Sequence, residues 1–145
     1  MRQLLFRLIG ILEVAGGLYG LAAKLGQLLR FGSFHVSIEA LLALAAYAFV
    51  LVAGVLLLEN SERGVRFSRW AQLLQLPLIA TPVFSYAMHC GGFLNVYAVL
   101  HMPLRPGLDW HFGSEGFVLA LAGPAASRVG INLLALLSWL ALRLR

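Results

Sequence analysis

The sequence is poor in the residues and motifs that most enzymes and soluble domains depend on. Its single cysteine, Cys90, excludes an internal disulfide, and no Cys/His pattern has the spacing of a zinc finger. Charged residues make up 12% of the chain, about half of their share in ordinary soluble domains. Phosphate-binding loops, nucleophile elbows and dinucleotide-binding glycine patterns are also missing. The sequence therefore favours a non-enzymatic protein without a metal or a cofactor.

The histidines do not form a recognisable ligand pattern. All four fall at or beyond the ends of apolar segments: His35, His89, His101 and His111. Membrane haem sites use histidines inside helices, so this placement argues against haem. A surface metal site built from the last three has no ligand spacing to support it.

The chain is rich in apolar residues. They make up 61% of its 145 residues, against roughly 45–50% in soluble domains, and the mean hydropathy is +0.87. One soluble domain of this size could not bury so much apolar surface, whereas a bilayer removes the problem. The net charge of +5 comes from short basic runs beside apolar segments, which is typical of topology signals and of contacts with anionic lipid. Nucleic acid is not expected as a partner.

The segment Trp70–Met88 organises this interpretation. It is 19 residues long, has no charge, and contains Pro77 and Pro82. The prolines predict a bent membrane helix, because neighbouring helices can satisfy the carbonyls that prolines free. Three other segments have the apolar character of membrane helices: residues 4–25, 40–58 and 129–144. The sequence thus predicts one integral membrane domain over residues 1–145, an all-α bundle of four transmembrane helices.

Between the third and fourth expected helices the periodicity changes to that of strands. Apolar residues alternate with others in three runs, residues 94–102, 108–112 and 117–122. A turn at 103–107 separates the first two runs. We therefore expect a small antiparallel β-meander over about residues 93–123, inserted between helices 3 and 4.

An alternative begins the last membrane helix at Phe117. It would bury Pro124, Ser127 and Arg128 in the middle of the membrane, which is costly. We therefore expect the fourth helix to begin near Val129, with snorkelling arginines at its ends to compensate for its short length.

The first expected helix contains a small-xxx-small pair, Gly16 and Gly20. Such a pair can form a dimerisation face or can allow close packing inside the protein's own bundle. We favour packing inside the bundle, because a bundle of four short helices needs such contacts too.

Basic residues are distributed unevenly around the four expected spans. Seven of the eleven would lie on one side: Arg2, Arg7, Arg63, Arg66, Arg69, Arg143 and Arg145. The positive-inside rule then places both termini in the cytoplasm and the β segment outside. The expected location is the cell membrane, and in a bacterium the inner membrane.

Each expected helix carries one polar side chain inside its span. Together these residues form a candidate polar layer: Glu13, Tyr47, Gln75 and Asn132. One interpretation is a proton-linked or ligand-binding site around Glu13, because a glutamate in hydrocarbon indicates function by default. The other is a hydrogen-bonded layer that holds four helices in register, with Glu13 protonated by desolvation. We favour the second, because four polar residues are few for a transport path.

These features predict a small polytopic membrane protein, best interpreted as a non-enzymatic accessory or assembly subunit. Its partner would be another membrane protein or a second copy, bound through the external β segment. The alternative is a membrane site for a lipid, quinone or small solute centred on Glu13, or a small transporter. The bilayer itself is the partner that the composition indicates most directly.

Overall fold

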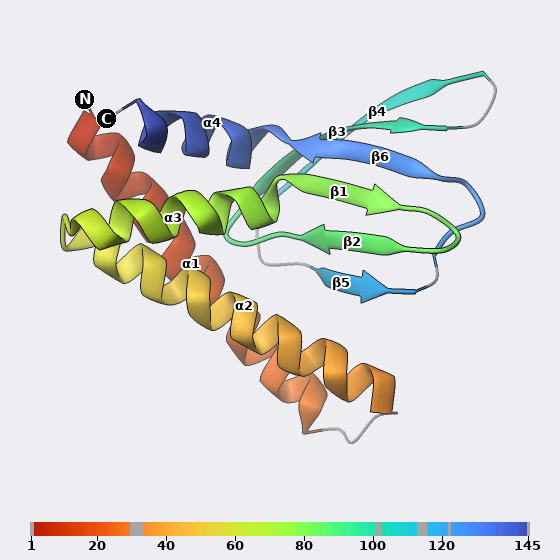
Figure 1. The fold of residues 1–145 in the computed structure, drawn as a ribbon, viewed down its shortest axis with the longest axis horizontal. Helices are drawn as coiled ribbons and strands as arrows, with labels where there is room; N and C mark the ends of the chain where they lie inside the picture. Colours follow the sequence, from red (N-terminus) through yellow and green to blue (C-terminus); the bar gives the residue numbers. More distant parts are fainter. Residues whose placement is uncertain (1, 30–33, 101–102, 113–115, 122, 145) are drawn as a thin grey trace.

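The protein combines a helical hairpin with an antiparallel sheet (Figure 1). The hairpin consists of α1 (Arg2–Leu28) and α2 (Phe34–Leu58), and two shorter helices, α3 (Glu62–Gln75) and α4 (Leu133–Arg143), pack against it and against each other. Both termini lie at the same end of the molecule (Figure 1). This computed structural model describes residues 2–29, 34–100, 103–112, 116–121 and 123–144.

Among the described helices, α1 and α2 are the two that are long and apolar enough to cross a membrane, over residues 3–28 and 36–58. Only 39% and 33% of their most apolar windows is buried, so most of each window faces outward. The core helix of a soluble protein would be mostly buried. Exposed apolar side chains instead follow both helices, among them Leu8, Leu18 and Leu41. The expected helices at 4–25 and 40–58 are therefore confirmed as helices, and their outward faces suit lipid.

The expected third membrane helix over residues 70–88 is wrong. The helix α3 begins earlier, at Glu62, and ends at Gln75. Pro77 has no N–H to continue the helix, and it opens strand β1 (Pro77–Ala80) instead. Pro82 lies in the turn that leads to β2 (Ser85–Met88). The two prolines therefore separate a helix from strands and do not bend a continuous helix.

The four-helix bundle with a small meander is also wrong, because six strands form one antiparallel sheet in the order β4-β3-β6-β1-β2-β5. The remaining strands are β3 (Phe93–Val99), β4 (Arg105–His111), β5 (Phe117–Ala120) and β6 (Arg128–Asn132). Alternation did indicate strands at β3, β4 and β5, and Val96 lies opposite Leu108. However, β5 pairs with β2 at the other edge of the sheet, so the three expected strands are not consecutive neighbours.

The expected start of the last helix near Val129 is wrong as well. This segment forms β6, which lies between β1 and β3 inside the sheet. The β-branched residues Val129 and Ile131 suit a strand that is paired on both sides. The helix α4 begins only at Leu133 and has 11 residues, fewer than the roughly 20 that a bilayer crossing needs.

Close contacts at glycines join α1 to α2 and to the segment between β2 and β3. A Cβ on Gly20 would overlap the ring of Tyr47 on α2, and a Cβ on Gly16 would overlap the backbone of Gly91, between β2 and β3. The Gly16–Gly20 pair therefore serves packing inside this chain, as expected.

One face of the sheet packs against the hairpin. Met88 of β2 and Phe117 of β5 are buried in the same apolar cluster as Tyr47 and Val50 of α2. Residues that lie opposite each other in the register share a face of the sheet. The face that carries Met88 therefore continues through β1 and β6 toward β3 and β4.

Candidate polar site between α1 and α3

Glu13 is the centre of a buried hydrogen-bonded cluster. Its side chain is 1% exposed. Its Oε2 lies at hydrogen-bond distance from Ser68 Oγ, 2.6 Å, and its Oε1 accepts a hydrogen bond from Gln72 Nε2 at 2.9 Å. Ser68 and Gln72 are themselves buried on α3. Both carboxyl oxygens of Glu13 are therefore bonded by a single helix, α3.

The contacts of Ser68 indicate the chemical form of Glu13. Ser68 Oγ also lies 3.3 Å from the carbonyl oxygen of Ala53 on α2. A hydroxyl has one hydrogen, so Ser68 cannot donate to both acceptors at once. A hydrogen on Glu13 Oε2 would let Ser68 donate to Ala53 and would satisfy both contacts. No basic side chain in the described part of the chain lies within ion-pair distance of Glu13, so the neutral form also avoids an unpaired buried charge.

Ser68 and Gln72 are not among the site residues expected from the sequence. Ser68 lies before the expected helix, which began only at Trp70, whereas Gln72 lies inside that helix but only Gln75 was chosen from it. In α3, residues Ser68, Gln72 and Gln75 follow the spacing i, i+4, i+7, which places them on one helix face. That polar stripe is the signal that could have identified them. It is visible only once the helix is extended back to Glu62.

Gln75 and Tyr47 contact the segment after β2 and not the Glu13 carboxyl. Gln75 Oε1 accepts from the backbone N–H of Cys90 at 3.1 Å, and Tyr47 donates its hydroxyl hydrogen to the carbonyl oxygen of His89 at 3.2 Å. Cys90 Sγ lies 4.0 Å from the backbone carbonyl oxygen of Glu13. Gln75 and Tyr47 thus hold the β2–β3 connection against α3 and α2.

Asn132 lies at the junction of β6 and α4, away from the Glu13 carboxyl. Its Oδ1 accepts from the backbone N–H groups of Leu94, Leu134 and Ala135 at 3.2, 3.1 and 3.3 Å. Asn132 therefore caps α4 and ties it to β3. Its Nδ2, and the Oδ1 of its register partner Asn95, are buried and find no hydrogen-bond partner among the described residues.

The Glu13 cluster borders a cavity of about 10 Å³. The polar side chains on its wall come from Glu13, Gln72, Gln75 and Ser138. A single water molecule needs about 10–15 Å³. The cavity can therefore accommodate one water molecule beside the carboxyl, and it has no room for a lipid, a quinone or an organic solute.

No protein family, curated protein or solved structure matches this chain. The geometry of the site is that of a closed joint in which the Glu13 carboxyl links α1 to α3. The four residues of the expected layer are all buried. Glu13 and Gln75 border the same small cavity, whereas the hydrogen bonds of Tyr47 and Asn132 join other pairs of elements.

Proposed function

We propose that this protein is a membrane-anchored accessory subunit, without catalytic activity, that binds a partner membrane protein through the uncovered half of its sheet. The hairpin of α1 and α2 is the anchor. The observation that carries the proposal is an exposed apolar surface on and beside β3, β4 and β6, which we call the open face. Its residues are Val96, Leu108, Trp110, Phe112, Val129 and Ile131.

The register makes the open face continuous. Val96 lies opposite Leu108 on one side and opposite Ile131 on the other. The rings of Trp110 and Phe112 contact each other edge to face, with centroids 6.2 Å apart. Leu108 and Trp110 are 64% and 65% exposed. Large exposed apolar patches of this kind mark interaction surfaces in most proteins.

The covered half of the same sheet face indicates the kind of partner. There, Met88 and Phe117 pack against apolar residues of α2. The open face presents the same chemistry two to four strands further along the sheet, so an apolar helix of a partner would continue an interface that the chain already makes with its own helix. This continuity supports a partner with membrane-type helices.

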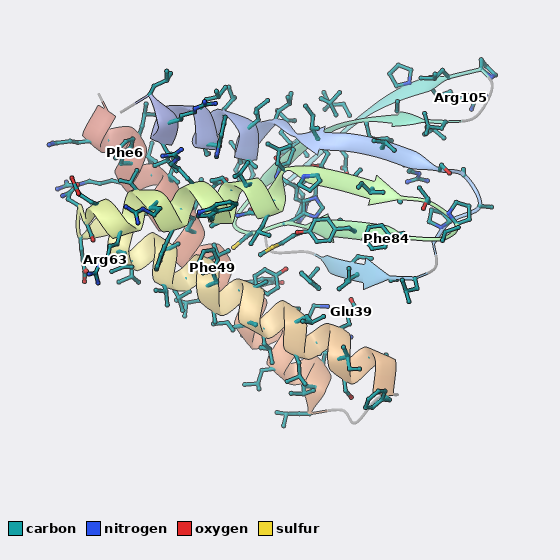
Figure 2. All side chains as sticks on the ribbon, in the orientation of Figure 1. Phe6, Glu39, Phe49, Arg63, Phe84 and Arg105 are labelled. Carbon is teal, nitrogen blue, oxygen red and sulfur yellow. The ribbon has the colours of Figure 1, made fainter. Side chains whose placement is uncertain are left out.

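Lipid is a poorer occupant of the open face. The reverse side of β4 carries Arg105 and Asp109, both exposed, and Arg105 lies at the end of the sheet away from the termini (Figure 2). The edge strands β4 and β5 also carry unpaired backbone groups. Hydrocarbon does not tolerate lipid-exposed sheet edges, and charged groups are costly there. These features favour a protein partner over lipid on the open face.

The hairpin of a second copy is also a poorer occupant. If the apolar stripe of one hairpin covered the open face of another copy, the open face of the first copy would remain free. Such a head-to-tail contact closes only into a ring and otherwise produces filaments. A different partner completes the surface in one step.

The expected alternative, a ligand site centred on Glu13, is not proposed. The cavity beside the carboxyl is about 10 Å³, far below the roughly 300–1,000 Å³ of small-molecule pockets. The closed geometry supports the interpretation of Glu13 as a link between helices.

Site-specific photo-crosslinking in cells that express the full chain tests the proposal. A photoreactive phenylalanine analogue replaces Trp110 and, as the matched control, Asp109, the neighbouring residue on the opposite face of β4. We expect position 110 to yield an adduct with one other membrane protein and position 109 to yield none. Leu108→Asp in the position-110 variant should abolish the adduct while the protein remains in the membrane fraction.

Three outcomes would overturn this proposal. An adduct of twice the 15.8 kDa chain mass would identify a second copy as the occupant. Equal adducts from both positions, or an adduct that survives Leu108→Asp, would show that the contact does not use the open face. The absence of any protein adduct at position 110 would show that no partner covers it.

A further inference from the structure

We infer that the groove between α3 and α4 is a binding site for a phosphate-bearing anion. The groove has a volume of about 310 Å³, at the lower end of the roughly 300–1,000 Å³ that small-molecule sites occupy. Three arginines, one carboxyl group and two apolar side chains line it: Arg66, Arg69, Arg143, Glu62, Val65 and Leu142.

The arginines converge on the groove from two helices. Arg66 and Arg69 are three residues apart on α3, so they share a helix face, and Arg143 comes from the last turn of α4. Val65 and Leu142 are 8% and 1% exposed. They give the groove an apolar floor, and the lower local dielectric strengthens the attraction between the guanidinium groups and an anion.

The charge of the groove suits a phosphate group. Glu62 offsets one of the three arginines, and two positive charges remain. Within the described residues, no carboxylate lies within ion-pair distance of Arg66, Arg69 or Arg143. Guanidinium groups bind phosphate oxygens through pairs of parallel hydrogen bonds, which makes arginine the preferred residue for this recognition.

Arg143 is already held in position for this role. Its guanidinium carbon lies 5.0 Å from the centroid of the Trp139 ring, within the range of a cation–π contact. A side chain that is ordered before binding loses less conformational entropy when the anion arrives.

The position of the groove leaves two sources of phosphate. It lies at the end of the molecule that holds both termini and the beginning of α3, where Figure 2 labels Arg63. An anionic phospholipid headgroup could reach this end from the membrane, and a soluble phosphate ester could reach it from the cytoplasm. The lipid source rests on the membrane anchoring proposed above, whereas the phosphate chemistry does not.

The test uses the full chain purified in detergent, with phosphatidylglycerol as the probe and diacylglycerol, which lacks the phosphate, as its control. Native mass spectrometry measures the fraction of protein that retains each lipid. We expect wild type to retain phosphatidylglycerol and not diacylglycerol. The double variant R66Q/R69Q loses two charged hydrogen-bond donors. Its affinity for phosphatidylglycerol should therefore fall by about tenfold or more.

The matched control is the double variant R7Q/R63Q. It removes the same charge from exposed arginines of α1 and α3 that do not line the groove. We expect it to retain phosphatidylglycerol within about twofold of wild type, because an equal loss of net charge alone changes a specific contact little. R143Q, on the other helix, provides an independent second variant, and circular dichroism verifies that each variant is folded.

Competition by excess inorganic phosphate then distinguishes the two sources. If inorganic phosphate displaces phosphatidylglycerol from wild type, and raises the melting temperature of wild type but not of R66Q/R69Q, the groove binds soluble phosphate. Retention of the lipid against inorganic phosphate would assign it to a headgroup. Equal weakening by R66Q/R69Q and R7Q/R63Q, or equal retention of diacylglycerol, would overturn the site. None of these outcomes depends on the partner proposed for the open face.

Discussion

The Glu13 carboxyl of α1 and the Ser68 hydroxyl of α3 lie 2.6 Å apart at a buried point, although 55 residues separate them in the sequence. The contact exists because α3 folds back along the hairpin (Figure 1). It explains how an apolar helix tolerates a glutamate, since buried polar groups are stable when they are hydrogen-bonded. Glu13 can therefore act as a link between helices or as a proton-binding group. Substitutions at position 13 distinguish these two roles.

The first prediction concerns Glu13 itself. Glu13→Gln should leave stability nearly unchanged, because glutamine keeps the shape of a neutral carboxyl and can bond both Ser68 and Gln72. Glu13→Leu should lower the free energy of unfolding by about 1–3 kcal/mol, because it leaves the buried Gln72 carboxamide without its acceptor. Thermal unfolding of the purified protein in detergent measures both effects.

Ser68→Ala supplies the control for this prediction. If Glu13 and Ser68 act as one link, the double variant Glu13→Leu/Ser68→Ala should lose less stability than the two single losses added together. A Glu13→Gln variant that folds and inserts normally but loses the cellular function of the protein would instead identify Glu13 as a proton-binding group.

The second prediction concerns the contact of α1 with α2. Gly20→Ala should lower the free energy of unfolding by about 1–3 kcal/mol, because the new Cβ would overlap the Tyr47 ring in a packed interior. Gly26→Ala is the matched control on the same helix. Nothing lies within 4 Å of a Cβ there, so the substitution should be neutral or stabilising by about 0.5–1 kcal/mol. Equal effects at the two positions would show that the α1–α2 contact differs from this structure.

The third prediction concerns topology. With α1 and α2 as the membrane anchor proposed above, the chain crosses the bilayer twice before the sheet, and not three times, so it returns to the side of its N-terminus. Reporter fusions after Gly107 and after Arg145 should therefore both report the cytoplasm, where the arginine-rich end with the termini belongs. The four-span arrangement expected from the sequence placed position 107 outside. An external reporter at position 107 together with a cytoplasmic reporter at position 145 would contradict this prediction. That result would show that the chain crosses the bilayer between the two positions.

Local patterns in the sequence predicted correctly those elements whose structure depends mainly on their own residues. The long apolar runs predicted α1 and α2, because an apolar segment of that length makes a helix that can lie in lipid. The alternation over Leu94–Val99 and Leu108–His111 predicted strand character, because successive side chains of a strand point to opposite faces. The lone carboxyl of Glu13 predicted a buried residue that needs partners on another helix, although it did not identify them.

Pairing between distant segments was decided only by the tertiary structure. The strand pattern specifies which residues share a face but not which strand lies alongside, so β5 pairs with β2 and not with β4. Likewise, Pro77 is compatible with a bent membrane helix or with the first residue of a strand, and pairing of β1 with β6 selects the strand. Asn132 became a helix cap for the same reason, because the residues before it are held in β6 between two neighbours. Composition and periodicity are properties of neighbouring residues, whereas these outcomes depend on contacts that form only when segments far apart in the chain meet.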